Sequence, residues 1–348
     1  MTVQDARTSQ CPWCAHVLDD PVRGFPCGCG NCLNVWDIPS DEPWEPQRVS
    51  AAPDLQHISR SDPRAAAVFK GVYSCIRSVS VIPEIPQRAI GLLHDPLVDI
   101  GEIADLIRED AVLTLGTLRL ANSVAYGARQ TTQDLKAACT RLGVKGIAKL
   151  MWTALNASLY RKGLAPFRTQ LVRLWKHSAA VAECAELLVE AANVPEDHLV
   201  YVGALLHDVG KVVLLQAVCN LPARAVSAFA RSPRDTENLL RTYHAPLGLH
   251  AVQYMKAPPE VRTITLYHHS VEMVTDPRVA QFTRLVACAN ALAGEAGYDA
   301  YATEGRSAAD TSERTCLLNL GLKENTLQEI KEAIPERVEG ILSTFAVE

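Results

Sequence analysis

The stretch "ALLHDVGKVVLL" (residues 204–215) places His207 and Asp208 side by side within an apolar run that favours a helix. Burying a histidine and a carboxylate together is costly unless each has a partner, because the protein interior lacks the water that solvates them. Lys211 follows His207 by four residues and Asp208 by three, so a helix brings it to the same face. We expect Lys211 either to neutralise Asp208 or to hold a phosphate group beside it.

The segments around this stretch are predicted to be helical. Residues 198–218 are apolar on nearly all sides, which is typical of a central buried helix. Gly210 in their middle indicates a break or a close contact between helices. Residues 171–194 predict a long amphipathic helix that Pro195 ends.

The helical pattern extends over most of the chain. Residues 100–123 carry apolar side chains at three- and four-residue spacing and predict two helices separated near Asp110. Strand signals are weak after residue 45. Hydrophobic residues make up 48% of the 348 residues and aromatic ones only 6%, which favours helices packed through aliphatic side chains. The predicted fold class is therefore all-α.

The charge and hydropathy of the chain exclude several classes of protein. A net charge of -5 argues against general nucleic-acid binding. Apolar runs such as "LVYVGALL" are too short to span a membrane, and the polar first ten residues predict no secretory signal. We expect a cytoplasmic protein that binds no membrane, in which the cysteines are thiols or metal ligands rather than disulfides.

Residues 1–45 form a separate unit rich in Cys, Gly and Trp, and a proline-rich stretch at 46–63 predicts an extended linker. The unit contains two C-x-x-C pairs, Cys11/Cys14 and Cys29/Cys32. Two such pairs can complete a tetrahedral Zn²⁺ site, and metal binding would supply the folding free energy that so small a core lacks. A structural zinc ribbon that docks a partner is the leading interpretation, with Cys27 or His16 as substitute ligands. A redox C-x-x-C pair and a disordered tail are the alternatives.

Histidines recur through the C-terminal half in apolar, helix-like surroundings. They are His177, His207, His244, His268 and His269. A single histidine of this kind is more often a core residue than a ligand. Five on separate segments, with Asp208 beside one of them, favour a site for Mn²⁺, Fe or Zn²⁺, because imidazoles and carboxylates bind these ions.

In these motifs the chain resembles the HDOD family, a regulatory offshoot of the HD-domain metal phosphohydrolases. The resemblance covers roughly residues 75–295. It rests on "VIPEIPQRAIGLLHDP", "RLANSVAYG", "AACTRLGVKGIAKL" and "ALLHDVGK", together with the histidine motifs. It implies a two-lobed helical bundle, with an N-terminal lobe at 64–165 and an HD-like lobe at 166–348. It also implies signal transduction through partner binding, often without catalysis.

The resemblance further implies which residues form the HD-type site. His177 matches the first histidine of that site, and His207 and Asp208 match its His-Asp pair. The final aspartate should stand in "LVACANALAG", where this chain has Asn290. A neutral amide is a weaker metal ligand than a carboxylate, so the site is expected to be degenerate. Binding of Mn, Fe or Mg through the remaining ligands is left open.

His244, His268 and His269 match the additional histidines of the HD-GYP relatives, which cleave cyclic dinucleotides. The residues after the double histidine, "SVEMVTDPR", contain no Gly-Tyr-Pro. This departure argues against hydrolysis of cyclic dinucleotides.

Charge is unevenly distributed along the chain. Residues 81–110 contain seven acidic residues and two arginines, whereas residues 141–176 contain eight basic residues and no acidic one. The basic ones are Arg141, Lys145, Lys149, Arg161, Lys162, Arg168, Arg173 and Lys176. Such runs are usually solvated helix faces, but this one could also receive a nucleotide phosphate or an acidic partner.

Three functions compete on these grounds. The leading one is a non-catalytic signalling protein. Its helical domain binds a protein partner or a small ligand, and its zinc ribbon docks a partner. The alternative is a divergent metal-dependent phosphohydrolase or phosphodiesterase acting on a nucleotide or cyclic dinucleotide. A nucleic-acid-associated regulator is the weakest of the three, since aromatic residues are too sparse in the basic run for base stacking.

Overall fold

The structure is a computed structural model of the whole chain. It describes residues 26–28, 35–37, 68, 72, 76, 83–93, 95, 97–123, 126, 130–161, 165–195, 198–301 and 320–345. The predicted zinc ligands Cys11, Cys14, Cys29 and Cys32 lie outside these residues, as do His16 and the linker at 46–63. The described part of the first 45 residues is one antiparallel pair of strands, β1 (Pro26–Gly28) and β2 (Val35–Asp37).

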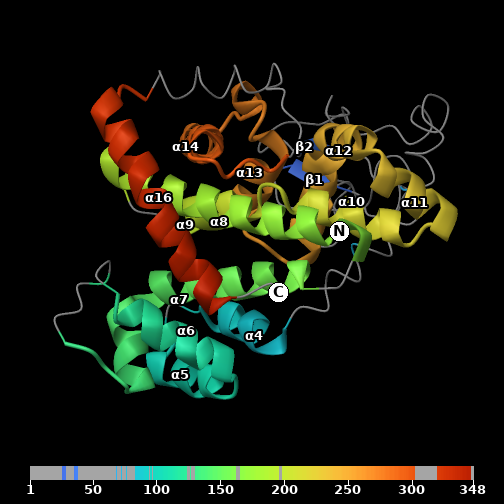
Figure 1. Cartoon of the computed structure of the whole chain (residues 1–348). Coiled ribbons are helices and arrows are strands. Elements are labelled where there is room, and N and C mark those ends of the chain that lie inside the picture. The colour runs from blue at the N-terminus through green and yellow to red at the C-terminus, as the bar shows by residue number, and fades with distance from the viewer. Residues whose placement is uncertain are drawn as a thin grey trace, which may run out of the picture.

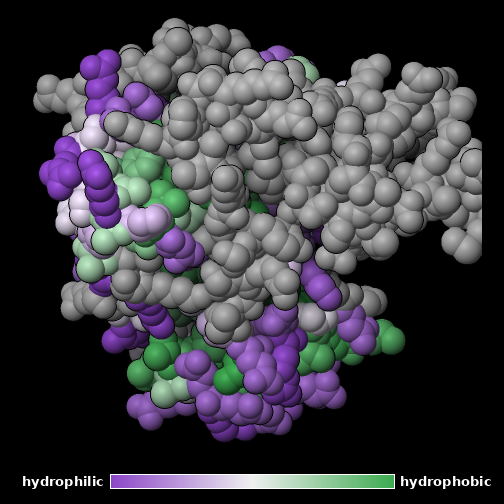
Figure 2. Space-filling view, turned by 90° about the vertical axis from the view of Figure 1, so that its right-hand side faces the viewer, coloured by the Kyte–Doolittle hydropathy of each residue, from purple (hydrophilic) through white to green (hydrophobic). Residues whose placement is uncertain are grey.

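The N-terminal group of helices lies at the bottom of Figure 1. It consists of α4 (Glu84–Leu93), α5 (Ile100–Arg108), α6 (Ala111–Ala121) and α7 (Leu135–Tyr160). The predicted separation near Asp110 is confirmed, because the Asp110 carboxylate accepts hydrogen bonds from the Val112 and Leu113 N–H groups at the start of α6. In Figure 2 this region shows hydrophilic residues around smaller hydrophobic areas.

The remaining helices pack above this group (Figure 1). They are α8 (Arg168–Ala191), α9 (His198–Leu206), α10 (Val209–Cys219), α11 (Ala223–Arg231), α12 (Pro233–Tyr254), α13 (Pro259–Tyr267), α14 (Pro277–Glu295) and α16 (Glu324–Thr344). Short 3₁₀ turns, η2 (Ala165–Phe167) and η3 (Val271–Met273), precede α8 and α14. From residue 83 onward the described chain is helical with connecting turns, so the all-α expectation is confirmed there. β1 lies against α12 and α13.

The buried helical segment predicted over 198–218 is confirmed, and it contains a break close to Gly210. Its apolar residues form two helices, α9 and α10, which a turn at His207 and Asp208 separates. Residues 198–219 are long and apolar enough to cross a membrane, yet 94% of their most apolar window is buried inside the protein. The segment is therefore a core element, as its all-round hydrophobicity predicted, and the turn carries the two polar side chains within it.

Gly210 holds α10 close to α12, the pair of helices with the most extensive contact in the molecule's described part. A Cβ atom at Gly210 would lie 1.9 Å from the carbonyl oxygen of His244 and 2.7 Å from the backbone N of Gly248. No side chain fits between these backbones. The close approach brings the start of α10 to the turn of α12 that carries His244.

Replacing Gly210 with alanine is expected to lower the free energy of unfolding by about 1–3 kcal/mol or more, because α10 and α12 must move apart. Gly340→Ala on α16 is the matched control, since nothing lies within 4 Å of a Cβ there. The control should be neutral or stabilise by up to about 1 kcal/mol, as alanine favours helix over glycine. Urea unfolding measures both variants, and equal stability of the two would contradict this packing.

The C-terminal helix α16 crosses the other helices and joins the two groups (Figure 1). Its buried side chains Leu327, Ile330, Ile334 and Val338 face the core, and it packs against α8 and α6. Arg337 on α16 donates a hydrogen bond to Glu183 on α8 over 3.3 Å. Burial, with a smaller contribution from the nearby Glu186 carboxylate, raises the pKa of Glu183 to about 7.

The raised pKa of Glu183 predicts a dependence of stability on pH. A carboxyl whose pKa is higher in the folded protein stabilises the fold at low pH and loses that contribution as pH rises. The free energy of unfolding of the wild type, relative to Glu183→Gln, should therefore fall between about pH 4.5 and 7. Glu190→Gln, at an exposed position of α8, is the control and should show no such trend. A difference that stays flat across this range would refute the assignment.

Candidate functional site

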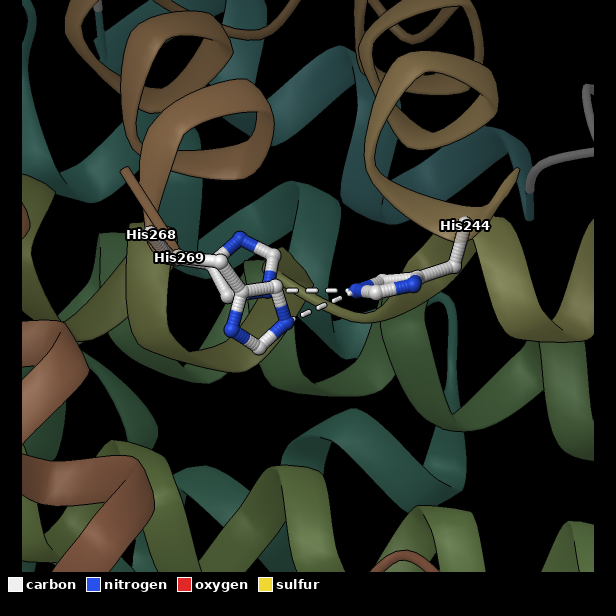
Figure 3. A group of neighbouring side chains, drawn as sticks. All are labelled: His244, His268 and His269. Carbon is white, nitrogen blue, oxygen red and sulfur yellow. Dashed lines mark hydrogen bonds between the residues drawn. The ribbon is translucent and has the colours of Figure 1, made fainter. Parts of the chain in front are cut away.

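Seven of the side chains that the sequence singles out lie together in one buried group, here called the His–Asp cluster. It consists of His177, His207, Asp208, Lys211, His244, His268 and His269. His177 comes from α8, the His207–Asp208 turn joins α9 to α10, and Lys211 lies in the first turn of α10. His244 lies in the middle of α12, and His268 and His269 directly follow α13 (Figure 3).

Asp208 is the centre of the cluster and is 2% exposed. Its Oδ2 atom lies 3.3 Å from Nε2 of His177 and 3.4 Å from Nε2 of His207. Its Oδ1 atom lies 3.4 Å from Nε2 of His244 and 3.9 Å from Nε2 of His268, yet accepts no hydrogen bond. The carboxylate thus stands between two sets of histidines, with one oxygen turned toward each.

The backbone orients four of the five imidazoles in the same way. The Nδ1 atom of each faces a backbone carbonyl oxygen. The pairs are His177 with Tyr298 (2.7 Å), His207 with Ala204 (2.6 Å), His244 with Leu240 (2.8 Å) and His268 with Thr265 (3.0 Å). A carbonyl can only accept, so Nδ1 carries the hydrogen and donates it. In the neutral ring Nε2 then presents a lone pair to the interior of the cluster.

These Nε2 atoms face one another at short distances. His177 and His207 are 3.3 Å apart at Nε2, and His244 lies 3.3 Å from His268 and 3.2 Å from His269 (Figure 3). Two lone pairs cannot form a hydrogen bond with each other, so the contacts His177–His207 and His244–His268 are unfavourable between neutral rings and would become favourable with a shared cation. Histidines that bind metals characteristically donate the other ring N–H to a carbonyl or carboxylate.

The donor set fits divalent cations in two groups. His177, His207 and Asp208 offer ligand atoms within 4.8 Å of one another, as do His244, His268 and His269. Burial and the neighbouring charges lower the pKa of His244 and of His268 well below the usual histidine value, so both rings are neutral near pH 7. Neutral imidazole is the form that binds a metal.

Lys211 compensates the buried carboxylate. Its Nζ atom donates a hydrogen bond to Oδ2 of Asp208, and both side chains are at most 5% exposed. Burial alone would raise the pKa of Asp208, but the interactions with His207 and with the Lys211 ammonium hold it well below its usual value. In turn Asp208 raises the pKa of Lys211 in spite of burial. Of the two roles expected for Lys211, neutralisation is the one that this geometry displays.

Tyr301 is a neighbour of the cluster that sequence reasoning missed. Nζ of Lys211 lies 4.4 Å from the centre of the Tyr301 ring, and Cζ of Arg241 lies 3.7 Å from it. Arg173 donates a hydrogen bond to the Tyr301 carbonyl oxygen over 2.9 Å. No spacing rule connects a tyrosine 90 residues downstream with Lys211, so only the folded chain reveals this contact.

Asn290 and the basic run are two further features that the sequence singles out. Asn290 lies half-buried on α14, which packs against α8 and α9 and so adjoins the helices that lead to the cluster. The basic run at 141–176 is not a uniform solvated face. Lys149 within it is 7% exposed and pairs with Glu186, because α7 packs against the neighbouring helices at that point.

The family model for the HDOD domain matches residues 79–271 of the chain, which is more than half of it. The chain belongs to the HDOD family. An uncharacterized protein of Treponema pallidum (strain Nichols) is 24% identical over 200 residues, covering 55% of this chain and 38% of that protein. This HDOD chain therefore spans well under half the length of that relative.

Solved structures share the fold of this HDOD protein. An HDOD domain protein of unknown function from Geobacter sulfurreducens matches with a TM-score of 0.59 and 24% identity, over 82% of this chain and 99% of that one. A Shewanella amazonensis protein, provisionally named a metal-dependent phosphohydrolase, has a TM-score of 0.59 and 16% identity, over 80% and 99%. A Marinobacter aquaeolei protein, provisionally named for signal transduction, matches with a TM-score of 0.52 and 21% identity, over 89% of this chain and 70% of that one. At these identities the likeness shows the fold alone.

Replacing Lys211 with methionine tests the compensation of Asp208. In the presence of a chelator this variant should lose about 3–5 kcal/mol of unfolding free energy, because it leaves a buried carboxylate without a counter-charge. Added Mn²⁺ should stabilise the variant more than the wild type, since the cation would take over the role of the ammonium group. Thermal and urea unfolding with and without Mn²⁺ measure this difference.

Lys176→Met, at an exposed position on α8, serves as the control and should change stability by no more than about 0.5 kcal/mol. If Lys211→Met is as stable as this control in the presence of the chelator, Lys211 does not compensate Asp208.

Proposed function

We propose that this HDOD protein is a signal-transduction component that acts by binding a partner or a small ligand rather than by turning over a substrate. The observation that carries the proposal is the burial of Asp208 together with its ion pair to Lys211. A carboxylate neutralised by a lysine inside the core is stable without a metal, so the fold does not depend on a loaded catalytic centre. A phosphoester would also have to reach side chains that are almost wholly covered.

The same proposal includes metal binding by the His–Asp cluster. Mn²⁺, Fe²⁺ or Mg²⁺ would be held by His177, His207 and Asp208, and a second ion by the other three histidines. A bound cation would supply a Lewis acid in the centre of the cluster. The helices α8, α10 and α12 meet at the His–Asp cluster. Occupancy of the cluster by a metal ion would therefore be communicated to these helices of the core.

Asn290 supports a regulatory rather than a catalytic role. The family resemblance puts an aspartate at this position in active HD enzymes, and an amide carries no negative charge to balance a dication. Changes even outside the direct ligands can lower metal affinity by about 10–100-fold. The expected consequence is a cluster that binds metal weakly and responds to its concentration.

The N-terminal cysteines extend the proposal to partner binding. Cys11, Cys14, Cys29 and Cys32 would hold a structural Zn²⁺, and the resulting ribbon would dock a protein partner in a cytoplasmic pathway. The part of this unit that the structure describes, β1 and β2, is a short antiparallel pair beside α12 and α13. A ribbon in this position would be next to the helices that carry His244 and lead to His268.

A divergent metal-dependent phosphohydrolase is the second candidate. The observation that favours it is the convergence of Nε2 atoms on Asp208, with Nδ1 of four rings tied to backbone carbonyls. Such a preorganised donor set is what a metal-activated water requires. The two functions differ in turnover and in how tightly the cluster holds its metals.

Metal counting and turnover separate the two candidates. The purified protein is expected to contain one Zn²⁺ per chain and to hydrolyse neither nucleotides nor cyclic dinucleotides with added Mn²⁺ or Fe²⁺. Zinc quantified by elemental analysis and products resolved by chromatography provide the measurement. Two or three metals per chain, with turnover that Asp208→Ala abolishes, would establish the phosphohydrolase instead.

Asn290→Asp should raise the occupancy of Mn²⁺ in the helical domain, because it restores a negative charge beside the cluster. Equilibrium dialysis against Mn²⁺ measures the occupancy, with Asn238→Asp on an exposed position of α12 as the matched control. Unchanged occupancy in Asn290→Asp would show that Asn290 does not occupy the position of the missing aspartate.

A further inference from the structure

A small cleft opens between the start of α8 and the α11–α12 pair. Its volume is about 190 Å³. The side chains that give it chemical character are Phe167, Thr169, Arg173, Phe229, Thr236 and Glu237. Pockets for drug-sized ligands have volumes of about 300–1,000 Å³, so this cleft admits a molecule with little more than one ring and one charged group.

Arg173 gives one end of the cleft an affinity for anions. Its side chain is half-buried, and its hydrogen bond to the Tyr301 carbonyl oxygen uses one of five N–H donors. In the described part of the chain no carboxylate forms an ion pair with Arg173. A guanidinium with spare donors in a sheltered cleft is suited to bind phosphate oxygens in a bidentate way.

The rest of the lining determines what else the ligand carries. Phe167 and Phe229 are 4% and 7% exposed and provide an apolar wall, against which a planar ring can pack. Among the described residues of this lining, Glu237 contributes the one carboxylate, and it is 4% exposed. An anionic group is therefore drawn to the Arg173 end and away from Glu237.

We propose that this cleft binds a small phosphomonoester with one aromatic or heterocyclic ring, and that binding there is sensed by the His–Asp cluster through Tyr301. Arg173 holds the phosphate, and the ring packs against Phe167 and Phe229. The second half of the proposal deepens the proposed function, because it names an input for the metal-binding cluster. The first half stands without any metal.

The route to the cluster consists of three contacts. Arg173 holds the Tyr301 carbonyl, the Tyr301 ring is in contact with both Arg241 and Lys211, and Lys211 is paired with Asp208. A phosphate bound to the remaining donors of Arg173 draws the guanidinium toward itself and weakens the hydrogen bond to the Tyr301 carbonyl. Tyr301 is then less firmly held against Lys211, and the ammonium is freer to give way to a metal at Asp208.

Calorimetric titration of the full chain in a chelating buffer tests the site itself. Phenyl phosphate and 3-pyridyl phosphate are the probes, with inorganic phosphate, phenol and 3-hydroxypyridine as the matching parts. At least one of the two phosphomonoesters is expected to bind about tenfold or more tightly than either of its parts. Arg173→Ala should weaken that binding by about tenfold or more, because charged hydrogen bonds to the phosphate are lost.

Two further variants serve as controls. Lys176→Ala removes an exposed charge one turn along α8 and should leave the affinity unchanged. Arg173→Lys keeps the charge without the bidentate geometry and should bind with intermediate affinity, which distinguishes a lost contact from a lost fold. No saturable binding of either phosphomonoester, or equal binding by Arg173→Ala, would overturn the proposal.

The coupling is tested by titrating Mn²⁺ with and without saturating phosphomonoester. The wild type should bind Mn²⁺ more tightly with the ligand present, and Tyr301→Ala should bind the ligand but lose this effect. An unchanged Mn²⁺ affinity in the wild type would refute the coupling but not the cleft. Absence of any Mn²⁺ binding would count against the proposed function, and the titration in chelator would still decide the cleft.

Discussion

The buried carboxylate of Asp208 is the constraint on which the rest of this structure depends. A charge that is 2% exposed must be compensated, and Lys211 provides the counter-charge. Four separate segments of the chain bring histidines around it, and backbone carbonyls set the directions of four of the five rings. The helices of the upper part of the molecule are therefore arranged around a polar centre, not only around an apolar core.

Close helix packing makes this arrangement possible. Gly210 lets α10 approach α12 until their backbones touch, which brings Asp208 and His244 to within 3.4 Å. The turn at His207 and Asp208 interrupts an otherwise continuous apolar segment at the one place where two polar side chains must face inward. In the proposed function the cluster has two states, one in which the Lys211 ammonium group neutralises Asp208 and one in which a bound metal ion does. The exchange between these states would serve regulation without cleaving any bond.

Several parts of the fold followed from local patterns. The separation of α5 from α6 was predictable because Asp110 is a helix-capping residue, and the end of α8 because a proline follows it closely. The histidines and Asp208 were predictable as a group, since buried polar residues are rare in apolar helices without a shared purpose. The basic run was misjudged at Lys149, because a charge pattern along the sequence does not reveal that Glu186 of a neighbouring helix pairs with it.

The sequence by itself determined the helical fold of the described residues from 83 onward, the resemblance to the HDOD family, and the identity of the side chains that meet at the centre of the cluster. Spacing and chemistry suffice for this, because helical periodicity and ligand type are local properties. Only the tertiary structure decided that carbonyls set the tautomers of four histidines, that the Asp208 oxygens divide between two groups of imidazoles, and that Tyr301 reaches Lys211. These are distances between segments far apart in the chain, and they depend on how closely the helix backbones can approach.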